Sequence, residues 1–247
     1  LTLHDIAFSK YRRIHQIEKK PARKLRSWLH SQMLQRWEPR YLANFDLCIA
    51  MSDVDRAILL EKNPHLRVEV IPNGIDTELY QLLPYEEAHQ DLIFVGDMDY
   101  LPNVDAMIYF TKEILPLIRK EIKDIQMWIV GLNPRPAVRT LAGNGVHVTG
   151  RVDDVRQYYL RSNICVIPLR AGGGTRLKIL ESMAMKKPVV STSVGAEGLK
   201  VTDGKDILLA DEPVTFAQRV NFLLREPAAR QALGNAGWET AKSLYDW

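Results

Sequence analysis

Cysteine is scarce in this sequence, and long apolar runs are missing from it. The chain has 247 residues and two cysteines, Cys48 and Cys165. Both stand in short apolar segments without metal-ligand spacing, so we expect buried free thiols rather than a disulfide or a metal site. No apolar run approaches the roughly 20 residues that a membrane-spanning helix needs, and no signal-peptide pattern opens the chain. These absences favour a globular protein of the cytoplasm.

The net charge is small, at +3, but its distribution is uneven. Residues 10–40 hold ten Lys or Arg and two Glu. Between these charges, apolar residues recur at the three- and four-residue spacing of one helix face: Leu25, Trp28, Leu29, Met33, Leu34 and Trp37. A basic amphipathic helix with tryptophans can lie in the interface of an anionic membrane, here on its inner face. The alternative is a helix packed on other protein with a solvated basic face. Nucleic acid is not expected, because aromatics at helical spacing form no base-stacking platform.

Short apolar runs alternate with amphipathic stretches, which is typical of an α/β fold with a parallel sheet. The expected strands are residues 46–51, 68–71, 92–95, 126–130, 146–148, 164–167, 189–191 and 207–209. The opening LTLHD resembles the end of a strand already under way, so the chain is expected to be a fragment. Asn103 is expected to cap a helix that runs to Arg119, and Ser52 with Asp53 to cap another.

The most informative segment is PLRAGGGTRLKILESMAMKKPVVSTSVGAEGL, from Pro168 to Leu199. Its triple glycine can present backbone N–H groups to an anion, and the start of the following helix adds free donors and a positive dipole end. Lys178 and Glu181, three residues apart, share one helix face. A cation there suits a diphosphate, and the carboxylate suits a ribose diol. The pattern predicts a nucleotide diphosphate site; the alternative is a structural turn with two solvated charges.

The same segment resembles the donor-binding signature of the retaining glycosyltransferases of family 4, which have the GT-B fold. It is most similar to a bacterial subgroup whose motif begins GGGTRLKILEAMA. Three further segments agree in order and spacing: IPNGIDTELY at 71–80, FVGDMDYLPNVDAMIYF at 94–110 and VTGRVDDVRQYY at 148–159. The resemblance extends over nearly all of residues 46–246.

This resemblance implies a domain organisation. Residues 1–86 would be the remainder of a truncated N-terminal, acceptor-side Rossmann-like domain, with a hinge at 72–74. Residues 87–237 would form the C-terminal Rossmann-like domain that binds the nucleotide sugar, and residues 238–247 a C-terminal helix segment.

The resemblance also implies the contacts of the donor. Glu181 occupies the position of the second Glu of an E-x7-E motif, which binds the ribose, while Gly173 replaces the first Glu. Arg151 and Val152 match the loop that receives the nucleobase, and Glu197 a loop that approaches the sugar. His4 would line the cleft, although a structural histidine at a strand end is an equal alternative. The implied catalytic residues are His4 and Lys178, and the implied donor-binding residues are Gly96, Arg151, Val152, Gly172, Gly173, Gly174, Thr175, Arg176, Leu177, Lys178, Glu181 and Glu197.

Two positions depart from many relatives, which carry an Arg after the first Rossmann glycine and a Lys about five residues later. Here these positions are Asp97 and Pro102. Since the acidic Asp97 would repel a diphosphate, we expect Arg176 and Lys178 to neutralise the charge of the diphosphate instead.

The resulting hypothesis is a hexosyltransferase that moves a sugar, with retention, from a nucleotide diphosphate sugar to an acceptor hydroxyl on a carbohydrate or lipid-linked acceptor. Glycan, polysaccharide or glycolipid synthesis would be its setting, without a metal or another cofactor. Two alternatives stay open: a GT-B sugar-nucleotide epimerase and a noncatalytic nucleotide-sugar binding module. A dehydrogenase is disfavoured, because VGDMDYLPN lacks the glycine spacing of a dinucleotide site.

Overall fold

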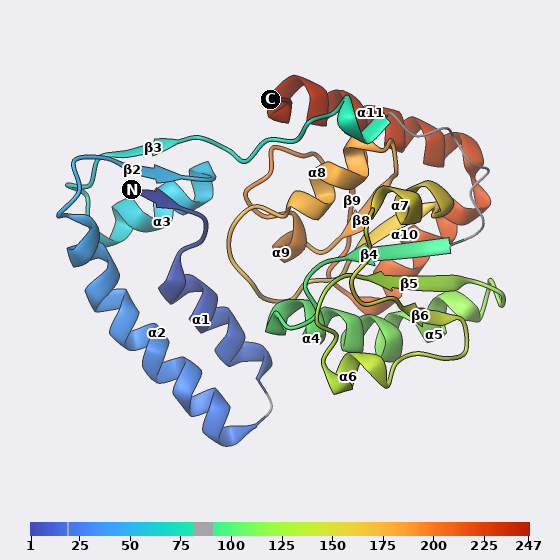
Figure 1. Cartoon of the computed structure of the whole chain (residues 1–247), viewed down its shortest axis with the longest axis horizontal. Coiled ribbons are helices and arrows are strands. Elements are labelled where there is room, and N and C mark those ends of the chain that lie inside the picture. The colour runs from blue at the N-terminus through green and yellow to red at the C-terminus, as the bar shows by residue number, and fades with distance from the viewer. Residues whose placement is uncertain (19, 82–90) are drawn as a thin grey trace. The chain divides into compact units, whose positions relative to one another are not determined.

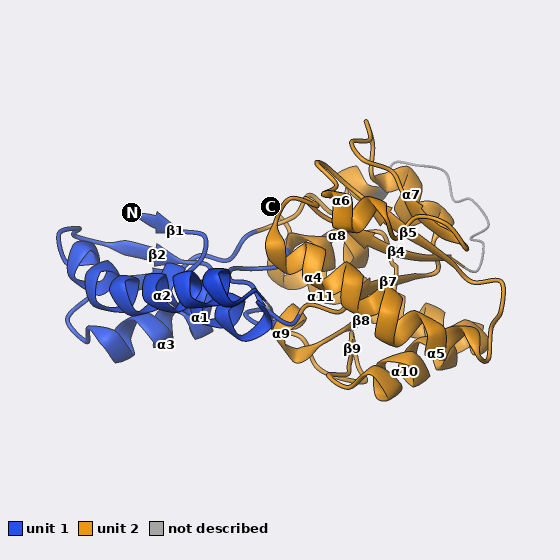
Figure 2. Ribbon diagram, turned by 90° about the horizontal axis from the view of Figure 1, so that it is seen from below, with its two compact units in different colours: residues 1–73, 170–176, 197–199 blue, residues 74–169, 177–196, 200–247 orange. Residues whose placement is uncertain are grey.

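A computed structural model describes residues 1–18, 20–81 and 91–247 (Figure 1). The chain divides into two compact units (Figure 2). The N-terminal unit holds residues 1–73, 170–176 and 197–199, and the C-terminal unit holds the rest of the described chain. The domain boundary expected between residues 86 and 87 lies outside the described residues.

The N-terminal unit is built on a three-stranded parallel sheet in the order β1-β2-β3. The strands are β1 (Thr2–Leu3), β2 (Cys48–Ala50) and β3 (Val68–Val70). Its helices are α1 (Ala7–Ile17), α2 (Pro21–Leu42) and α3 (Asp53–Lys62). The core gathers apolar side chains from sheet and helices: Ile6, Phe8, Leu42, Cys48, Ala50, Leu59, Leu66 and Val68. The strand expected at LTLHD is therefore confirmed as β1.

Buried polar groups fasten α1 to α2, which run side by side (Figure 1). The Glu38 carboxylate of α2 accepts from the backbone N–H groups of Ala7 and Phe8, both at 3.1 Å. These N–H groups open α1, where they have no partner inside the helix. Burial raises the pKa of Glu38 against the lowering effect of these two hydrogen bonds. The Ser31 hydroxyl donates to the Phe8 carbonyl at 3.1 Å.

The C-terminal unit contains a six-stranded parallel sheet in the order β6-β5-β4-β7-β8-β9. The strands are β4 (Asp91–Val95), β5 (Gln126–Val130), β6 (Val146–Val148), β7 (Ile164–Ile167), β8 (Val189–Ser191) and β9 (Leu208–Leu209). They confirm the expected strands of this region to within one residue. Leu92, Ile93, Phe94 and all of β7 are fully buried, as in a sheet covered on both faces.

Helices and helical turns connect these strands. They are η1 (Leu79–Gln81), α4 (Leu101–Tyr109), a π-helical turn (Phe110–Ile114), α5 (Leu115–Arg119), α6 (Pro136–Arg139), α7 (Arg156–Arg161), α8 (Leu177–Ala184), α9 (Ser193–Ala196), α10 (Pro213–Arg225) and α11 (Pro227–Tyr245). The expected C-terminal segment 238–247 continues α11 without a break up to Tyr245.

One expected cap is wrong and another is confirmed. Asn103 does not cap a helix, because α4 has Tyr100 as its N-cap residue and Asn103 lies inside the first turn. Its side chain is engaged instead by the Asp97 carbonyl and by Lys178. Ser52 caps α3, since its hydroxyl accepts from the Asp55 N–H at 3.1 Å.

Both cysteines are buried and free, as expected from the sequence. Burial raises the pKa of the Cys165 thiol to about 12, so the thiol is protonated at neutral pH. Among the helices of the described ranges, none combines the length and the apolarity that crossing a bilayer would take.

Candidate functional site

The sheet of the C-terminal unit has a topological switch point between β4 and β7. From β4 the chain proceeds to β5 and β6 on one side, and from β7 to β8 and β9 on the other. Ligands of open α/β sheets bind outside the carboxyl ends of the strands at such a point. Gly96 directly follows β4, and Lys178 and Glu181 lie on α8, the helix that comes after β7 in the chain. The fold of the C-terminal unit therefore places these three predicted residues at the position where a ligand crevice is expected.

Lys178 of α8 extends toward the carboxyl end of β4. Its Nζ donates to Asn103 Oδ1 at 2.9 Å and lies 4.0 Å from the centroid of the Phe94 ring. A Cβ added at Gly96 would stand 2.7 Å from the same Nζ, closer than real contacts allow. The missing side chain of Gly96 thus makes room for an ammonium group above β4.

Glu181 lies one helical turn further along α8 and is held by two tyrosines. Its Oε2 accepts from the Tyr159 hydroxyl at 3.1 Å, and the carboxylate is also hydrogen-bonded to Tyr80. Burial, and next the nearby Glu181 charge, raises the pKa of both phenols above the ordinary value. Both hydroxyls are therefore protonated at neutral pH and can act as donors to the carboxylate.

Arg156 holds the turn that carries Tyr80. Its guanidinium donates to the Leu79 carbonyl at 2.7 Å and to Asp154 Oδ2 at 2.7 Å. The hydrogen bond with Arg156 lowers the pKa of Asp154. Asp154 also accepts from the backbone N–H of Arg156, the first residue of α7, at 2.9 Å. The segment after β6 is thereby tied to η1 and, through η1, to the neighbourhood of Glu181.

The predicted site residues belong to both units. Gly96, Arg151, Val152, Leu177, Lys178 and Glu181 lie in the C-terminal unit, and His4, Gly172, Gly173, Gly174, Thr175, Arg176 and Glu197 lie in the N-terminal unit. In the C-terminal unit the structure brings Gly96 and Lys178 together, while Arg151 is exposed and Val152 half-buried in the segment after β6. The roles of Arg151 and Val152 toward a nucleobase stay predictions.

In the N-terminal unit the glycine loop, residues 172–174, meets the chain that follows β1. Gly174 has φ +70°, and a Cβ there would stand 2.2 Å from the His4 carbonyl oxygen. A Cβ at Gly173 would lie 3.0 Å from Asp5 Cβ. Side chains at these positions would separate the two segments. The structure therefore places the His4 backbone against the loop and leaves its side chain exposed, and the role of that side chain toward a sugar stays a prediction.

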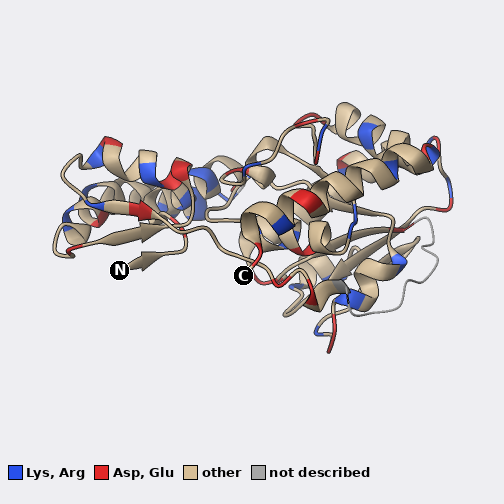
Figure 3. Cartoon of the chain, turned by 90° about the horizontal axis from the view of Figure 1, so that it is seen from above, with Lys and Arg blue, Asp and Glu red and all other residues tan. Residues whose placement is uncertain are grey.

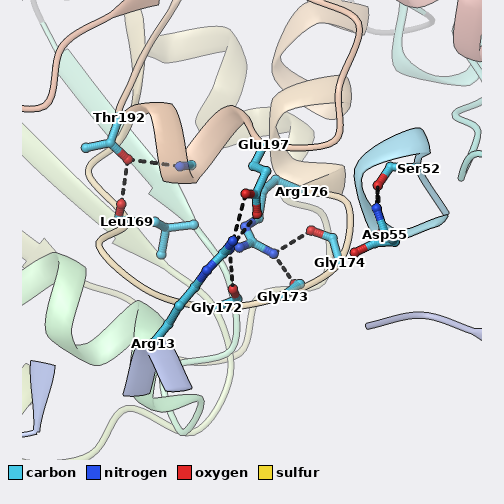
Figure 4. A network of polar contacts seen from close by, with 11 residues as sticks. Arg13, Ser52, Asp55, Leu169, Gly172, Gly173, Gly174, Arg176, Thr192 and Glu197 are labelled. Carbon is cyan, nitrogen blue, oxygen red and sulfur yellow. Dashed lines mark hydrogen bonds and ion pairs between the residues drawn. The ribbon is translucent and has the colours of Figure 1, made fainter. Parts of the chain in front are cut away.

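Arg13 is a site residue that the sequence analysis missed. Its guanidinium donates to the Gly172 carbonyl at 3.0 Å and pairs with both carboxylate oxygens of Glu197, one of them at 2.7 Å (Figure 4). A planar guanidinium favours such a bidentate pair with a carboxylate. Glu197, predicted to approach the sugar, is in this structure the partner of Arg13. Arg13 is one of ten basic residues in the stretch 10–40, and no motif around it distinguishes it from the others.

Arg176, predicted to neutralise a diphosphate, turns back onto the glycine loop (Figure 4). Its Nη1 donates to the carbonyl oxygens of Gly173 and Gly174, the latter at 2.5 Å, and the residue is buried. Thr175 donates to the Met51 carbonyl at 3.5 Å. Here Arg176 braces the loop, so binding a phosphate would require it to exchange these carbonyl partners.

Asp55 adds a half-buried carboxyl to this neighbourhood. The Ser52 hydroxyl donates to it at 2.8 Å. Burial raises its pKa, and the charge of Glu197 acts in the same direction, while those of Arg176 and Arg13 oppose it. Asp55, Glu197 and the guanidinium groups of Arg13 and Arg176 form one mixed-charge cluster in the N-terminal unit.

Comparison with known proteins assigns the family. The family described as "Glycosyl transferases group 1" matches residues 89–226, more than half of the chain. The chain belongs to the group 1 glycosyltransferases. A second family description, "Glycosyltransferase Family 4", matches residues 1–79. The resemblance inferred from the glycine segment is thereby confirmed at the level of the family.

Curated relatives match over part of their length. An uncharacterised glycosyltransferase of Methanocaldococcus jannaschii is 29% identical over 198 residues, which are 76% of this chain and 52% of that protein. An uncharacterised 44.6 kDa protein in the cps region of Klebsiella pneumoniae is 29% identical over 139 residues, 53% of this chain and 36% of that protein. The chain thus spans between about a third and a half of the curated relatives it matches.

Solved structures confirm the predicted GT-B type of α/β fold. Sucrose-phosphate synthase of Thermosynechococcus elongatus superposes with a TM-score of 0.76 at 24% identity, covering 100% of this chain and 63% of that one. HepE of Anabaena, in complex with UDP and glucose, gives a TM-score of 0.74 at 19% identity, covering 99% and 67%. At these identities the likeness concerns the fold of this group 1 glycosyltransferase.

Proposed function

We propose that this glycosyltransferase moves a hexosyl group, with retention of anomeric configuration, from a nucleoside diphosphate sugar to an acceptor hydroxyl. The observation that carries the proposal is the pair on α8: Lys178 projects to Gly96 at the end of β4, and Glu181 stands one turn away between two tyrosines. A cation and an acceptor-only carboxylate at that separation suit a diphosphate and a ribose diol. The switch point is where such a ligand is expected.

In this proposal the protein acts mainly by electrostatics. Negative charge builds on the diphosphate as the glycosidic bond breaks, and fixed donors aimed at that charge lower the barrier. Lys178 supplies the cation, and Gly172, Gly173 and Gly174 supply N–H groups. His4 would line the sugar side, with Thr175, Arg176, Leu177 and Glu197 completing the loop, and Arg151 and Val152 would meet the base. Retention would follow from attack of the acceptor on the face that the diphosphate leaves, with no metal required.

The donor and the pathway form part of the proposal. UDP and glucose are bound by HepE, and UDP with GlcNAc by a pneumococcal O-GlcNAc transferase, so uridine diphosphate sugars are the first donors to test. A carbohydrate or lipid-linked acceptor, and a place in polysaccharide or glycolipid synthesis, fit a relative in a cps region. Peripheral contact with a membrane through residues 10–40 is proposed independently of the donor.

Calorimetric titration of the chain with UDP, GDP and ADP tests the donor site. We expect one of them to bind, and Glu181→Ala to weaken it about 10- to 100-fold, because hydrogen bonds to a charged group contribute about 1.5–3 kcal/mol. Glu239→Ala, which removes an exposed carboxylate from α11, is the matched control and should leave binding unchanged. Absence of binding to all three nucleotides would contradict the proposal.

A turnover assay separates the proposal from its two alternatives. The bound nucleotide's sugar conjugate is incubated with candidate acceptors, and the anomeric configuration of the product is determined by NMR. A transferase yields free nucleoside diphosphate and a glycosylated acceptor. Conversion of the donor in the absence of any acceptor would favour an epimerase, and binding without turnover in a longer protein that includes the acceptor side would favour a binding module.

A further inference from the structure

Helix α2 buries three polar residues and exposes most of its large apolar ones, although Leu42 at its C-terminal end belongs to the core. Its buried positions include Ser27, Ser31 and Glu38. Leu25, Leu29, Met33 and Trp37 follow one another at intervals of four residues on the roughly opposite side, and they are 57%, 51%, 59% and 55% exposed. Surface helices ordinarily bury their apolar stripe and expose their polar one. The outward residues of α2 therefore need another explanation than packing in the core of this unit.

We call these four residues, with Trp28, Arg36 and Arg40, the outward face of α2. Trp28 is 45% exposed beside Leu25 and Leu29. Trp37 stacks on Tyr41 with ring centroids 4.7 Å apart, so the aromatic end of the face is ordered. Tryptophan is favoured at the boundary between lipid headgroups and acyl chains, because its ring is apolar and its N–H is polar.

Every exposed charged residue of α2 is basic. Arg23, Lys24, Arg26, Arg36 and Arg40 are all exposed. The only acidic residue of α2 is Glu38, and its carboxylate is buried against the N-terminus of α1. Figure 3 shows where the basic and acidic residues of the N-terminal unit lie. A partner with negative charge is therefore complementary along the whole exposed length of α2.

The arrangement favours a membrane over a protein as that partner. Arg36 and Arg40 lie among the apolar residues of the outward face rather than at its rim. The centre of a protein interface is dry and depleted of charge, and an arginine buried there without a partner is costly. In a headgroup layer the same side chains keep water and meet lipid phosphates, while their stems cover apolar surface.

We propose that the outward face of α2 docks this protein on an anionic membrane. Leu25, Leu29, Met33 and the two tryptophans would enter the boundary between headgroups and acyl chains, and the arginines would bind phosphates of anionic lipids. The surface lies within the N-terminal unit, and its binding does not depend on whether the proposed donor site is correct. Failure of nucleotide binding and failure of membrane binding are thus separate results.

Vesicle flotation tests the proposal. The chain is mixed with vesicles of phosphatidylcholine alone or with added phosphatidylglycerol, at low and at high salt. We expect binding to the anionic vesicles that weakens with salt. The double variant Leu29→Gln/Met33→Gln should lower the partition constant by at least about tenfold, since two exposed apolar side chains no longer enter the lipid. Arg36→Gln and Arg40→Gln should each lower it roughly fivefold.

Matched controls keep the outcome interpretable. Phe222→Gln changes a side chain of α10 that is 50% exposed, and it should leave vesicle binding unchanged. Circular dichroism confirms that each variant is folded. Quenching of tryptophan fluorescence by brominated lipid should fall when Trp28 and Trp37 are both replaced by Phe, because the remaining tryptophans lie outside α2.

Three outcomes would overturn the proposal. The first is absence of binding to anionic vesicles at low salt. The second is binding that the α2 variants leave unchanged. The third is a dimer in size-exclusion chromatography that disappears in Leu29→Gln/Met33→Gln while vesicle binding stays absent, because the occupant of the outward face would then be a second copy of the chain.

Discussion

Helices α2 and α8 use similar residues in opposite ways. Both combine Leu, Met and basic residues at helical spacing. In α8 the apolar Ile179, Leu180 and Met183 are fully buried, and Lys178 and Glu181 make polar contacts at the end of the sheet. In α2 the buried positions include two serines and a glutamate, and Leu25, Leu29, Met33 and Trp37 are exposed, while Leu42 is buried.

The difference shows that helical periodicity identifies which residues share a face of a helix, but not whether that face is buried or exposed. The apolar arc of α8 packs against β7, β8 and α11, and its charged Lys178 and Glu181 are hydrogen-bonded to other side chains. The inner face of α2 packs against α1, which offers backbone N–H and carbonyl groups, so polar residues are suited to it. The first arrangement supports the proposed donor site, and the second supports the proposed docking surface.

The largest contrast is expected between two methionines. Met183→Ala in α8 removes a fully buried side chain and should lower the free energy of unfolding by about 2–5 kcal/mol. Met33→Ala in α2 changes a side chain that is 59% exposed and should cost less than about 0.5 kcal/mol. Urea unfolding followed by circular dichroism measures both. Equal losses would remove the basis of the comparison between the helices.

The next contrast concerns a buried and an exposed lysine. Lys187, three residues after α8, is buried and donates to the Leu160 carbonyl at 2.8 Å, and burial lowers its pKa to about 8. Between that value and the ordinary pKa of about 10.4, the unfolded chain binds a proton that the folded one has released. The free energy of unfolding should therefore rise with pH across this window, by at most about 3 kcal/mol.

Replacement of this lysine tests the pH dependence. Lys187→Met should flatten the rise, whereas Lys24→Met, at an exposed position of α2, should leave it intact. Urea unfolding at a series of pH values from about 7 to 10 compares the three proteins. Parallel curves for the parent and Lys187→Met would show that burial of this ammonium group does not perturb its titration.

Nucleotide binding should separate the basic residues of the two helices. Lys178→Ala should weaken the bound nucleoside diphosphate roughly 30-fold, which corresponds to about 2 kcal/mol for a charge-assisted contact. Lys24→Ala should change it less than about twofold, because an exposed charge of α2 acts only through screened long-range attraction. Calorimetry in the same buffer provides both values, and similar losses for the two variants would contradict a specific role of Lys178.

The smallest expected effect comes from Tyr80→Phe. This variant removes a hydroxyl that is hydrogen-bonded to Glu181, so the carboxylate loses part of its orientation and ribonucleotide binding should weaken about fivefold, or about 1 kcal/mol. The 2′,3′-dideoxy analogue, which lacks the diol, should bind both proteins equally. Tyr11→Phe in α1 serves as the control. An equal loss for both nucleotides would mean that Tyr80 does not act through the diol.

Much of the fold could be predicted from local pattern. The strands of the C-terminal unit were found because short apolar runs, bounded by polar residues, are buried on both faces. Lys178 and Glu181 could be placed on one face because helical spacing fixes their direction relative to each other. Asn103 was assigned wrongly, since a lysine 75 residues away in sequence competes for its side chain.

The remaining site residues had no local signal. Tyr80 and Tyr159 contact Glu181 from distant parts of the chain, and Arg13 reaches Glu197 across 184 residues. Their sequence neighbourhoods resemble those of any tyrosine or arginine on a helix or turn. Which face of α2 is buried could not be predicted from the sequence either, because only the structure shows that Ser27, Ser31 and Glu38 are among its buried residues.

Gly96 has a consequence for how this protein could lose its function. The position of the Lys178 ammonium depends on a residue that contributes no side chain, so one added methyl group would displace the cation while every charged residue stayed in place. A substitution at this uncharged position would thus change the electrostatics at the end of β4 without altering the net charge of the chain.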